Sequence, residues 1–264
     1  MTDFRPHYSE LQTRLNRFAT IRLEDMTSVR LLNRIDTKYL TTFEKLLELL
    51  DLAKEEYMVQ VIDGKRNLPY YTMYLDTDDC HMYTEHHRGK KCRKKIRIRR
   101  YESTMLSFLE IKSKNNRGRT QKKRVKCNTD EIMLHRDFIN LHTPYSIESL
   151  KRRIENRFNR ITLVNREMSE RLTIDTRLRF HNLCSGNRVM LSEIVIIELK
   201  RNGNIPSPVT GMLGRLQIRP CGFSKYCIGM AITDHRLKQN RFKERIRFME
   251  RNTTIVRDNE AWPD

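Results

Sequence analysis

The clearest pattern in this chain is an alternation of charged and apolar residues, which predicts β-strands. In the segment RKKIRIRRY, residues 93–101, Ile96 and Ile98 lie between residues that are charged. Side chains alternate between the two faces of a strand, so Arg97 and Arg99 share one face and the two isoleucines share the other. The segment therefore predicts a strand with one charged face and one face that packs in a core.

The same alternation recurs in four other segments, at residues 34–40, 108–114, 122–126 and 171–180. An ordinary surface sheet turns a mixed polar face to water, whereas these segments collect cations that repel one another unless an anion lies between them. We therefore expect an antiparallel barrel whose charged faces line the interior. Its apolar faces then point outward and need helices to cover them.

Helical periodicity predicts those covering helices. Thr42 is a candidate N-cap for a helix over 43–57, and further helices are expected over 146–158, 208–217 and about 223–248. Additional strands are expected over 56–63, 70–77, 160–168 and 191–200, with loops at 64–69, 115–118 and 185–187. Because the chain has no internal repeat, linker or shift in composition, we expect a single domain over residues 1–264.

Charge points to a polyanionic partner. The 264 residues include 52 Lys or Arg against 33 Asp or Glu, a formal net charge of +19. Between Arg88 and Lys126 there are 17 basic and two acidic residues, so most of the excess is concentrated where the alternation is strongest. Because so many like charges repel one another here, we expect Arg97→Ala to relieve repulsion between the cations and to leave the fold stable.

Other features narrow the class of protein. No apolar run approaches the roughly 18 residues that span a bilayer, and the N-terminus lacks the apolar stretch of a signal peptide, which predicts a cytoplasmic protein. The six cysteines have no spacing typical of a zinc site or a disulfide framework. Tyr70, Tyr71, Tyr74 and Tyr101 are candidates for stacking an adenine, but core packing is the favoured interpretation.

A series of short motifs identifies the family that this chain resembles. They are, in order, NRIDTKYL, YYTMYLDT, KIRIRRY, FLEIKSK, KKRVK, VNRE, RLTIDT, VIIELK and GFSKYCIG. This order resembles the VTC domain, the polyphosphate polymerase branch of the triphosphate tunnel metalloenzyme (CYTH-like) superfamily. The resemblance covers about residues 20–232 and leaves a C-terminal helix and tail at 233–264. It implies an α+β fold, an antiparallel tunnel of about eight strands with flanking helices.

The resemblance also implies a reaction, the transfer of the γ-phosphoryl group of ATP to a growing polyphosphate chain. The residues that it places in catalysis are Arg97, Arg99, Lys112, Arg166 and Lys200. Those that it places around the substrate phosphates are Arg34, Lys38, Lys122, Arg124, Ser224 and Lys225. Glu198 matches the glutamate that binds a catalytic Mn²⁺ or Mg²⁺ in the family. Asp36 and Glu110 are secondary candidates for metal binding, but for both the preferred interpretation is an ion pair with neighbouring Lys or Arg.

Alternative functions remain open at this stage. Val164 stands where family members often have Tyr, and Gly222 stands where some have Lys, so a noncatalytic module that binds polyphosphate or inositol phosphates is one alternative. A tunnel triphosphatase is another, because hydrolysis uses the same phosphate cradle. An inositol-phosphate regulator and a membrane-protein partner are further candidate partners. Specific nucleic-acid binding is not expected, because only Tyr101 and Phe108 interleave with the basic residues of 88–126.

Overall fold

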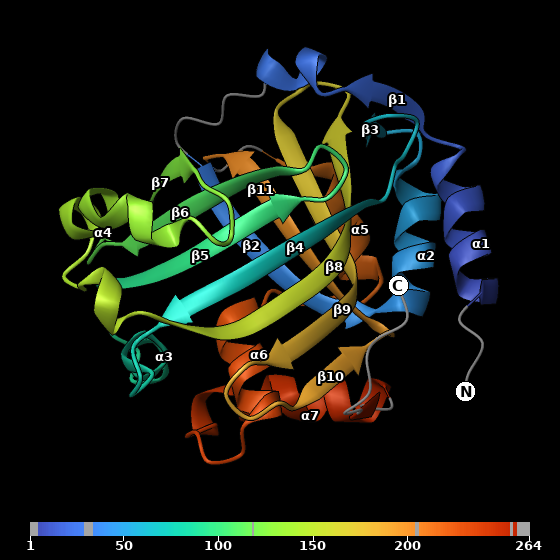
Figure 1. Ribbon diagram of the computed structural model, residues 1–264. Coiled ribbons are helices and arrows are strands. Elements are labelled where there is room, and N and C mark those ends of the chain that lie inside the picture. The colour runs from blue at the N-terminus through green and yellow to red at the C-terminus, as the bar shows by residue number, and fades with distance from the viewer. Residues whose placement is uncertain (1–4, 29–33, 118, 204–205, 254–255, 258–264) are drawn as a thin grey trace. The chain divides into compact units, whose positions relative to one another are not determined.

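The computed structural model describes residues 5–28, 34–117, 119–203, 206–253 and 256–257 (Figure 1). Its helices are α1 (Arg5–Leu15), α2 (Phe43–Ala53), α3 (His81–His87), α4 (Arg136–His142), α5 (Pro208–Arg215), α6 (Lys225–Thr233) and α7 (Lys243–Asn252). Short 3-10 helices are η1 (Glu24–Ser28), η2 (Ile132–His135), η3 (Ile147–Ser149) and η4 (Asn240–Phe242). The strands are β1 (Ala19–Arg22), β2 (Arg34–Thr42), β3 (Tyr57–Val61), β4 (Leu68–Asp76), β5 (Arg93–Tyr101), β6 (Leu106–Lys114), β7 (Thr120–Lys126), β8 (Lys151–Asn165), β9 (Glu170–Asn182), β10 (Arg188–Leu191), β11 (Ile194–Asn202) and β12 (Val256–Arg257).

Hydrogen bonds join these strands into one sheet. Eight of them follow the order β12-β10-β9-β8-β4-β5-β6-β7, while β11 pairs with β2 and β9, and β3 pairs with β1 and β8. Among the strand pairs with a described register, only β1 with β3 is parallel. The predicted α+β class, an antiparallel sheet with flanking helices, is confirmed. In the described residues eight of the twelve strands follow one continuous order, which agrees with the predicted number of about eight, and the closure of the sheet into a tunnel stays a prediction.

The chain divides into two compact units. The first unit comprises the described residues within 1–68, 159–177 and 192–223, and the second those within 69–158, 178–191 and 224–264. Strands β8 and β9 contribute residues to both units. The single domain over 1–264 stays a prediction.

The core of the first unit lies between helices and the apolar faces of its strands. Leu46 and Leu50 of α2 are fully buried in one cluster with Tyr39 of β2 and Ile197 of β11. As predicted, the hydroxyl of Thr42 caps α2 by accepting a hydrogen bond from the Lys45 amide at 3.4 Å. The helix ends at Ala53, earlier than expected.

The core of the second unit uses the apolar faces of β5 and β6, which Figure 1 shows beside β4 and β7. Ile96, Ile98, Leu109 and Ile111 are exposed by 1% or less and pack in one cluster with Ile139 of α4. The charged residues of these strands alternate with this buried set. The alternation read from the sequence is therefore confirmed in β5 and β6.

The helix expected over 146–158 is wrong. Only Ile147–Ser149 form a 3-10 turn, and residues 151–165 form the single strand β8, which also contains the strand expected over 160–168. Ile154, Asn156 and Phe158 are buried at a spacing of two residues. The Asn156 side-chain amide donates to the Arg179 carbonyl on β9 at 3.0 Å. Pairing with distant strands therefore overrides the local helical pattern.

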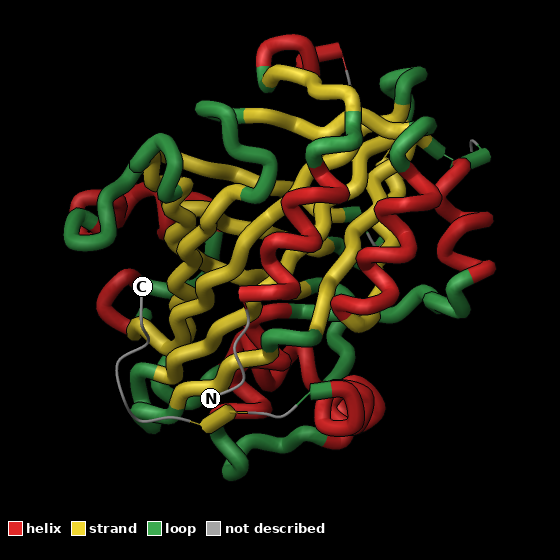
Figure 2. Tube along the Cα trace, turned by 90° about the vertical axis from the view of Figure 1, so that its right-hand side faces the viewer, coloured by secondary structure: helices red, strands yellow, loops and turns green. Residues whose placement is uncertain are grey.

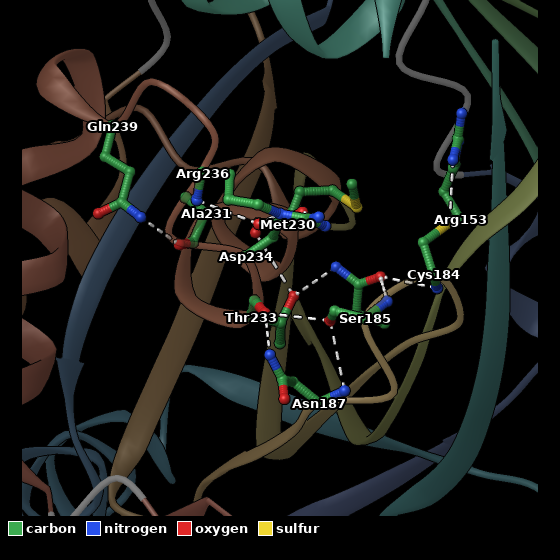
Figure 3. Close-up of polar contacts among 11 residues, drawn as sticks. Arg153, Cys184, Ser185, Asn187, Met230, Ala231, Thr233, Asp234, Arg236 and Gln239 are labelled. Atoms are coloured by element: carbon green, nitrogen blue, oxygen red, sulfur yellow. Dashed lines mark hydrogen bonds and ion pairs between the residues drawn. The ribbon is translucent and has the colours of Figure 1, made fainter. Parts of the chain in front are cut away.

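The expected helix over about 223–248 is divided into α6 and α7. Figure 3 shows why α6 ends at Thr233. The Thr233 carbonyl accepts hydrogen bonds from the Asn187 side chain at 2.8 Å and the Ser185 hydroxyl at 3.2 Å, and the Gln239 amide donates to the Ala231 carbonyl at 2.7 Å. Partners outside the helix thus satisfy its last carbonyls.

In the described residues the longest helices, α1 and α2, have 11 residues each, and the longest strands, β8 and β9, have 15 and 13; helices are red and strands yellow in Figure 2. In the described part of the chain, no helix has the length and apolar character needed to cross a bilayer.

We expect Gly229→Ala to destabilise the protein, because α6 passes very close to the second-unit core. A Cβ atom at Gly229 would lie 2.5 Å from Cδ1 of Phe180 and 2.8 Å from Cδ1 of Ile154. Overpacking of this kind costs about 1–3 kcal/mol in the free energy of unfolding, measurable by urea denaturation. Gly211→Ala in α5 is the matched control, since a Cβ there meets nothing within 4 Å. It should stabilise by up to about 1 kcal/mol. Equal effects of the two substitutions would contradict the close approach of α6.

Candidate functional site

The register of β5, β6 and β7 arranges the predicted basic residues of the second unit in rows. One row contains Lys95, Lys112 and Lys122, and the next contains Arg97, Glu110 and Arg124. A third row contains Arg99, Phe108 and Lys126. Residues paired directly across antiparallel strands lie on the same face. Five predicted site residues, Arg97, Arg99, Lys112, Lys122 and Arg124, are therefore brought together on one face.

Glu110 lies at the centre of these rows. Its side chain is fully buried, and Oε2 accepts hydrogen bonds from Nε and Nη2 of Arg97 at 2.8 and 2.5 Å. Oε1 accepts from Nζ of Lys122 at 3.2 Å. Burial raises the pKa of the Glu110 carboxyl, but the charges of Arg97, Arg99 and Lys122 outweigh it, and the net pKa falls well below its usual value. The preferred interpretation of Glu110, a partner for neighbouring cations, fits this geometry.

This geometry reverses the expected effect of Arg97→Ala. Arg97 is itself only 6% exposed, and its guanidinium also donates to the Tyr74 hydroxyl at 3.4 Å. Removing it leaves the Glu110 charge buried with only Lys122 as a hydrogen-bonded cation. Breaking a buried pair in this way typically costs about 3–5 kcal/mol. We therefore expect Arg97→Ala to destabilise the fold.

Arg99 is held by a different set of contacts. Its Nε donates to the Thr72 hydroxyl at 3.4 Å, and its guanidinium carbon lies 5.6 Å from the Tyr70 ring centre and 5.9 Å from that of Phe158. The side chain is 8% exposed. A cation above aromatic rings keeps its charge while its position is fixed.

The first turn of α6 brings Ser224 and Lys225 to the same second-unit strands. The Ser224 hydroxyl accepts a hydrogen bond from the Cys227 amide at 3.3 Å, which caps the helix, and another from Nζ of Lys95 at 2.7 Å. Nζ of Lys225 lies 4.0 Å from the centre of the Phe158 ring. Both predicted residues are thus placed by contacts with strands β5 and β8.

A buried carboxylate fixes this end of α6. Asp76, at the end of β4, is fully buried and accepts hydrogen bonds from the amides of Met82 and Tyr83, both at 2.9 Å. The Tyr226 hydroxyl also donates to Asp76. Strand β4, helix α3 and helix α6 therefore meet at one carboxylate, next to the residues that carry the predicted phosphate contacts.

The first unit has its own charged face, on β2 and β11. Lys38 is paired across the strands with Glu198, and Asp36 with Lys200. Lys200 forms an ion pair with Glu198, and its Nζ lies 3.6 Å from Oδ2 of Asp36. Burial lowers the pKa of Lys200, an effect that the two carboxylates partly oppose. This face therefore alternates positive and negative side chains, unlike the second-unit face.

Among the described side chains, the other site residues predicted in the first unit make separate contacts and do not form a row like those of β5, β6 and β7. Nζ of Lys38 donates to the Phe223 carbonyl at 3.3 Å. Arg166 is exposed, and its Nε donates to the Glu55 carbonyl at 2.5 Å in the turn after β8. Arg34 begins β2, but its side chain lies outside the described residues. The catalytic role of Arg166 and the phosphate contact of Arg34 stay predictions.

The oxygen atoms around Glu198 are suitable ligands for a hard divalent ion. Thr173 of β9 is paired directly with Glu198, and its buried hydroxyl has no hydrogen-bond partner within the described residues. A carboxylate, an orphaned hydroxyl and the nearby Asp36 are oxygen ligands that Mg²⁺ and Mn²⁺ accept. Within the described ranges no three His, Cys, Asp or Glu side chains gather. Such an ion would need phosphate oxygens to complete its shell.

Sequence reasoning missed Lys95 and Thr173 as site residues. Both lie on strands whose alternation was recognised, so the face of each residue was predicted. Their importance depends on partners remote in the chain, Ser224 for Lys95 and Glu198 for Thr173.

Comparisons with known proteins identify the family of this chain and several solved structures that are distantly similar to it. The model of the VTC domain matches residues 33–234. No curated protein matches the sequence. Similar solved structures include a candidate adenylate cyclase from Bacillus halodurans, 16% identical, with 73% of this chain and 96% of that chain covered and a TM-score of 0.46.

Two further structures are similar at the same level. An adenylyl cyclase candidate from Hippeastrum with a dominant triphosphatase activity is 12% identical, with 76% and 97% of the two chains covered and a TM-score of 0.45. A conserved hypothetical protein from Pyrococcus furiosus is 11% identical, with 72% and 97% covered and a TM-score of 0.41. With TM-scores below 0.5, these similarities assign no activity to this chain.

The environment of Glu110 predicts a pH-dependent contribution to stability. Because its folded-state pKa is lowered, the stabilisation is complete above its unfolded value, about 4.3, and is lost as the pH falls from there through the folded-state pKa. Glu110→Gln should therefore lower the free energy of unfolding at pH 7 by about 3 kcal/mol. The difference from the wild type should shrink below pH 4.

Urea denaturation between pH 3 and pH 7 measures this effect. Glu250→Gln, at an exposed position of α7, is the control and should change little at any pH. A constant difference between the wild type and Glu110→Gln across this range would rule out the ion pairs as its source.

Proposed function

Because the chain belongs to the VTC domain family, we propose that it is an ATP-dependent polyphosphate polymerase. A terminal oxygen of the growing chain attacks the γ-phosphorus of ATP, the bond from that phosphorus to the β–γ bridging oxygen breaks, and ADP leaves. ATP and polyphosphate are the proposed substrates, and the use of ATP favours a cytoplasmic location. An inositol-phosphate regulator and a membrane-protein partner stay predictions.

The observation that carries this proposal is the set of basic rows on β5, β6 and β7. Phosphoryl transfer needs little covalent help from a protein, but it needs phosphates held in line and their charge neutralised. Rows two residues apart along a strand are separated by about 6.6 Å. Cations repeated at that spacing can contact successive phosphates of a linear chain, which a single anion site cannot do.

The proposed roles follow from how firmly each side chain is held. Arg97 and Arg99 are buried and fixed by Glu110 and by aromatic rings, so we assign them to the stabilisation of charge on the transferring phosphoryl group. Lys122 and Arg124 are exposed and suit the binding of a sliding polyanion, although Lys122 is also hydrogen-bonded to Glu110. Lys112 lies between the two groups, in the row of Lys95 and Lys122.

Glu198 is the proposed ligand of the divalent ion. A bound Mn²⁺ or Mg²⁺ would neutralise phosphate oxygens and hold them in position. Lys200 keeps the Glu198 carboxylate in place through their ion pair and, with Lys38 on the neighbouring strand, adds positive charge beside it.

The direct test incubates the purified protein with ATP and Mn²⁺ or Mg²⁺ and follows long-chain polyphosphate on a gel together with ADP. Chains formed in step with ADP would support the polymerase. Phosphate release without chains would replace it by a triphosphatase, in which water attacks in place of the chain end. Tight binding of polyphosphate without turnover would replace it by a noncatalytic binding module.

We expect Glu198→Gln to abolish metal-dependent turnover while the protein stays folded. The substitution removes the anionic ligand but keeps the size of the side chain. Turnover is measured as ADP release over a series of Mn²⁺ concentrations, and folding by the melting temperature. Glu48→Gln, on the exposed side of α2, is the matched control and should keep full activity. Near-normal activity of Glu198→Gln would remove the metal assignment.

A further inference from the structure

Two cysteines and a buried arginine meet in the second unit, at the turn between β9 and β10. Within the described residues, which include all six cysteines, only Cys92 and Cys184 are exposed. Nη1 of Arg153 donates a hydrogen bond to Sγ of Cys184 at 2.9 Å, as Figure 3 shows. Arg153 belongs to β8 and is itself only 7% exposed. A solvent-accessible sulfur thus lies against a buried positive charge.

The surroundings of Arg153 favour a negative charge on that sulfur. The ion pair described for Arg153 joins it to Asp78 at 3.1 Å, and the Asp78 side chain is 79% exposed. Its other described hydrogen bonds go to the Thr77 carbonyl, which is neutral. A buried cation is stabilised by anions in close contact, and a neighbouring cation favours the thiolate, the nucleophilic form of a cysteine. Cys184 therefore has the environment of a reactive cysteine.

Cys80 lies beside the same guanidinium. Its amide donates at 3.0 Å to the Thr77 carbonyl, which also accepts from Nε of Arg153 at 3.0 Å. Cys80 is only 7% exposed. Burial raises the pKa of its thiol to about 11, with the charge of Arg153 lowering the pKa and that of Cys184 adding to the rise. Cys80 therefore stays protonated at neutral pH, so Cys184 is the first of the two to react with an oxidant.

The turn that carries Cys184 is held by a buried side chain. Oδ1 of Asn182 accepts hydrogen bonds from the amides of Cys184 and Ser185 at 3.0 and 3.1 Å. The Asn182 side-chain nitrogen donates to the Thr233 hydroxyl at 3.1 Å, at the end of α6. Asn182 is fully buried. The backbone of Cys184 is therefore fixed next to the guanidinium, although the sulfur is open to solvent.

We propose that Cys184 and Cys80 are a redox pair, which a peroxide converts into an intramolecular disulfide. The Cys184 thiolate attacks one oxygen of hydrogen peroxide, the O–O bond breaks, and hydroxide leaves and takes up a proton, which gives a sulfenic acid and water. The Cys80 sulfur then attacks the Cys184 sulfur, the S–O bond breaks, and the hydroxyl leaves with the Cys80 proton as a second water. Peroxide accepts both electrons of this oxidation.

This inference does not depend on the proposed polymerase. The Cys184 turn contacts Thr233 at the end of α6, whereas Ser224 and Lys225 lie at the start of that helix. A disulfide would tie the residue before α3 to the turn between β9 and β10. In a reducing compartment such bonds are usually transient and redox-sensing, so the pair indicates a state of the protein that responds to peroxide.

Mass spectrometry after oxidation tests the pair. The reduced full-length protein is treated with hydrogen peroxide, remaining thiols are blocked with N-ethylmaleimide, and tryptic peptides are analysed without reduction. We expect peptides joined through Cys80 and Cys184, in a chain lighter by two hydrogen atoms. Cys184→Ser should lose this cross-link, and Cys80→Ser should leave a sulfenic acid at Cys184 that dimedone traps.

Cys92→Ser, at the other exposed cysteine, is the matched control and should keep the cross-link. A wild type that forms no disulfide, or one that joins other cysteines instead, would overturn the redox pair.

The role of Arg153 is measured by the rate at which iodoacetamide alkylates Cys184 at pH 7. Arg153→Met removes one charge-assisted hydrogen bond to the thiolate, so the rate should fall on the order of tenfold, while Cys92 in the same chain serves as the reference and should not change. Arg153→Lys keeps the charge and should restore most of the rate. Melting temperatures identify the variants that fold. An unchanged Cys184 rate in folded Arg153→Met would remove Arg153 from the proposal, and the cross-link test holds without this variant.

Discussion

The structure depends on how like charges are kept together on the faces of β-strands. Arg97, Arg99, Lys112 and Lys122 lie on one face of β5, β6 and β7, where their mutual repulsion opposes folding. Glu110, fully buried among them, binds two of these cations through its two carboxylate oxygens. One embedded anion thus makes a strongly cationic face compatible with a folded core on the other side of the strands.

Each unit meets this constraint in its own way. In the first unit, Lys200 lies between Glu198 and Asp36, and Arg160 forms two hydrogen bonds with Asp175 at 2.6 and 2.8 Å, so acids nearly balance bases. In the second unit a single acid serves several cations. The second-unit face therefore keeps excess positive charge for a polyanion, whereas the first-unit face offers carboxylate oxygens to a metal ion.

The sequence was informative where local periodicity and tertiary environment agree. Alternation predicted β5 and β6 with their correct faces, and the order of motifs predicted the family that the match over residues 33–234 confirms. The helix expected over 146–158 failed because its pattern suits both periodicities, and pairing with distant strands decided between them. Contacts such as Lys95 with Ser224 and Asp76 with Tyr226 join residues 129 and 150 positions apart, which no local pattern encodes.

We infer that these cations are arranged for a linear polyphosphate rather than for anions in general. The most direct measurement compares the melting temperature in tripolyphosphate with that in monophosphate at matched total charge and low ionic strength. A ligand bound only by the folded state stabilises it by about 2.7 kcal/mol at a hundredfold excess over its Kd. We predict a rise of several degrees with tripolyphosphate, a larger rise with longer chains, and little change with monophosphate. Equal rises with tripolyphosphate and monophosphate would contradict the account and leave only a generic basic surface.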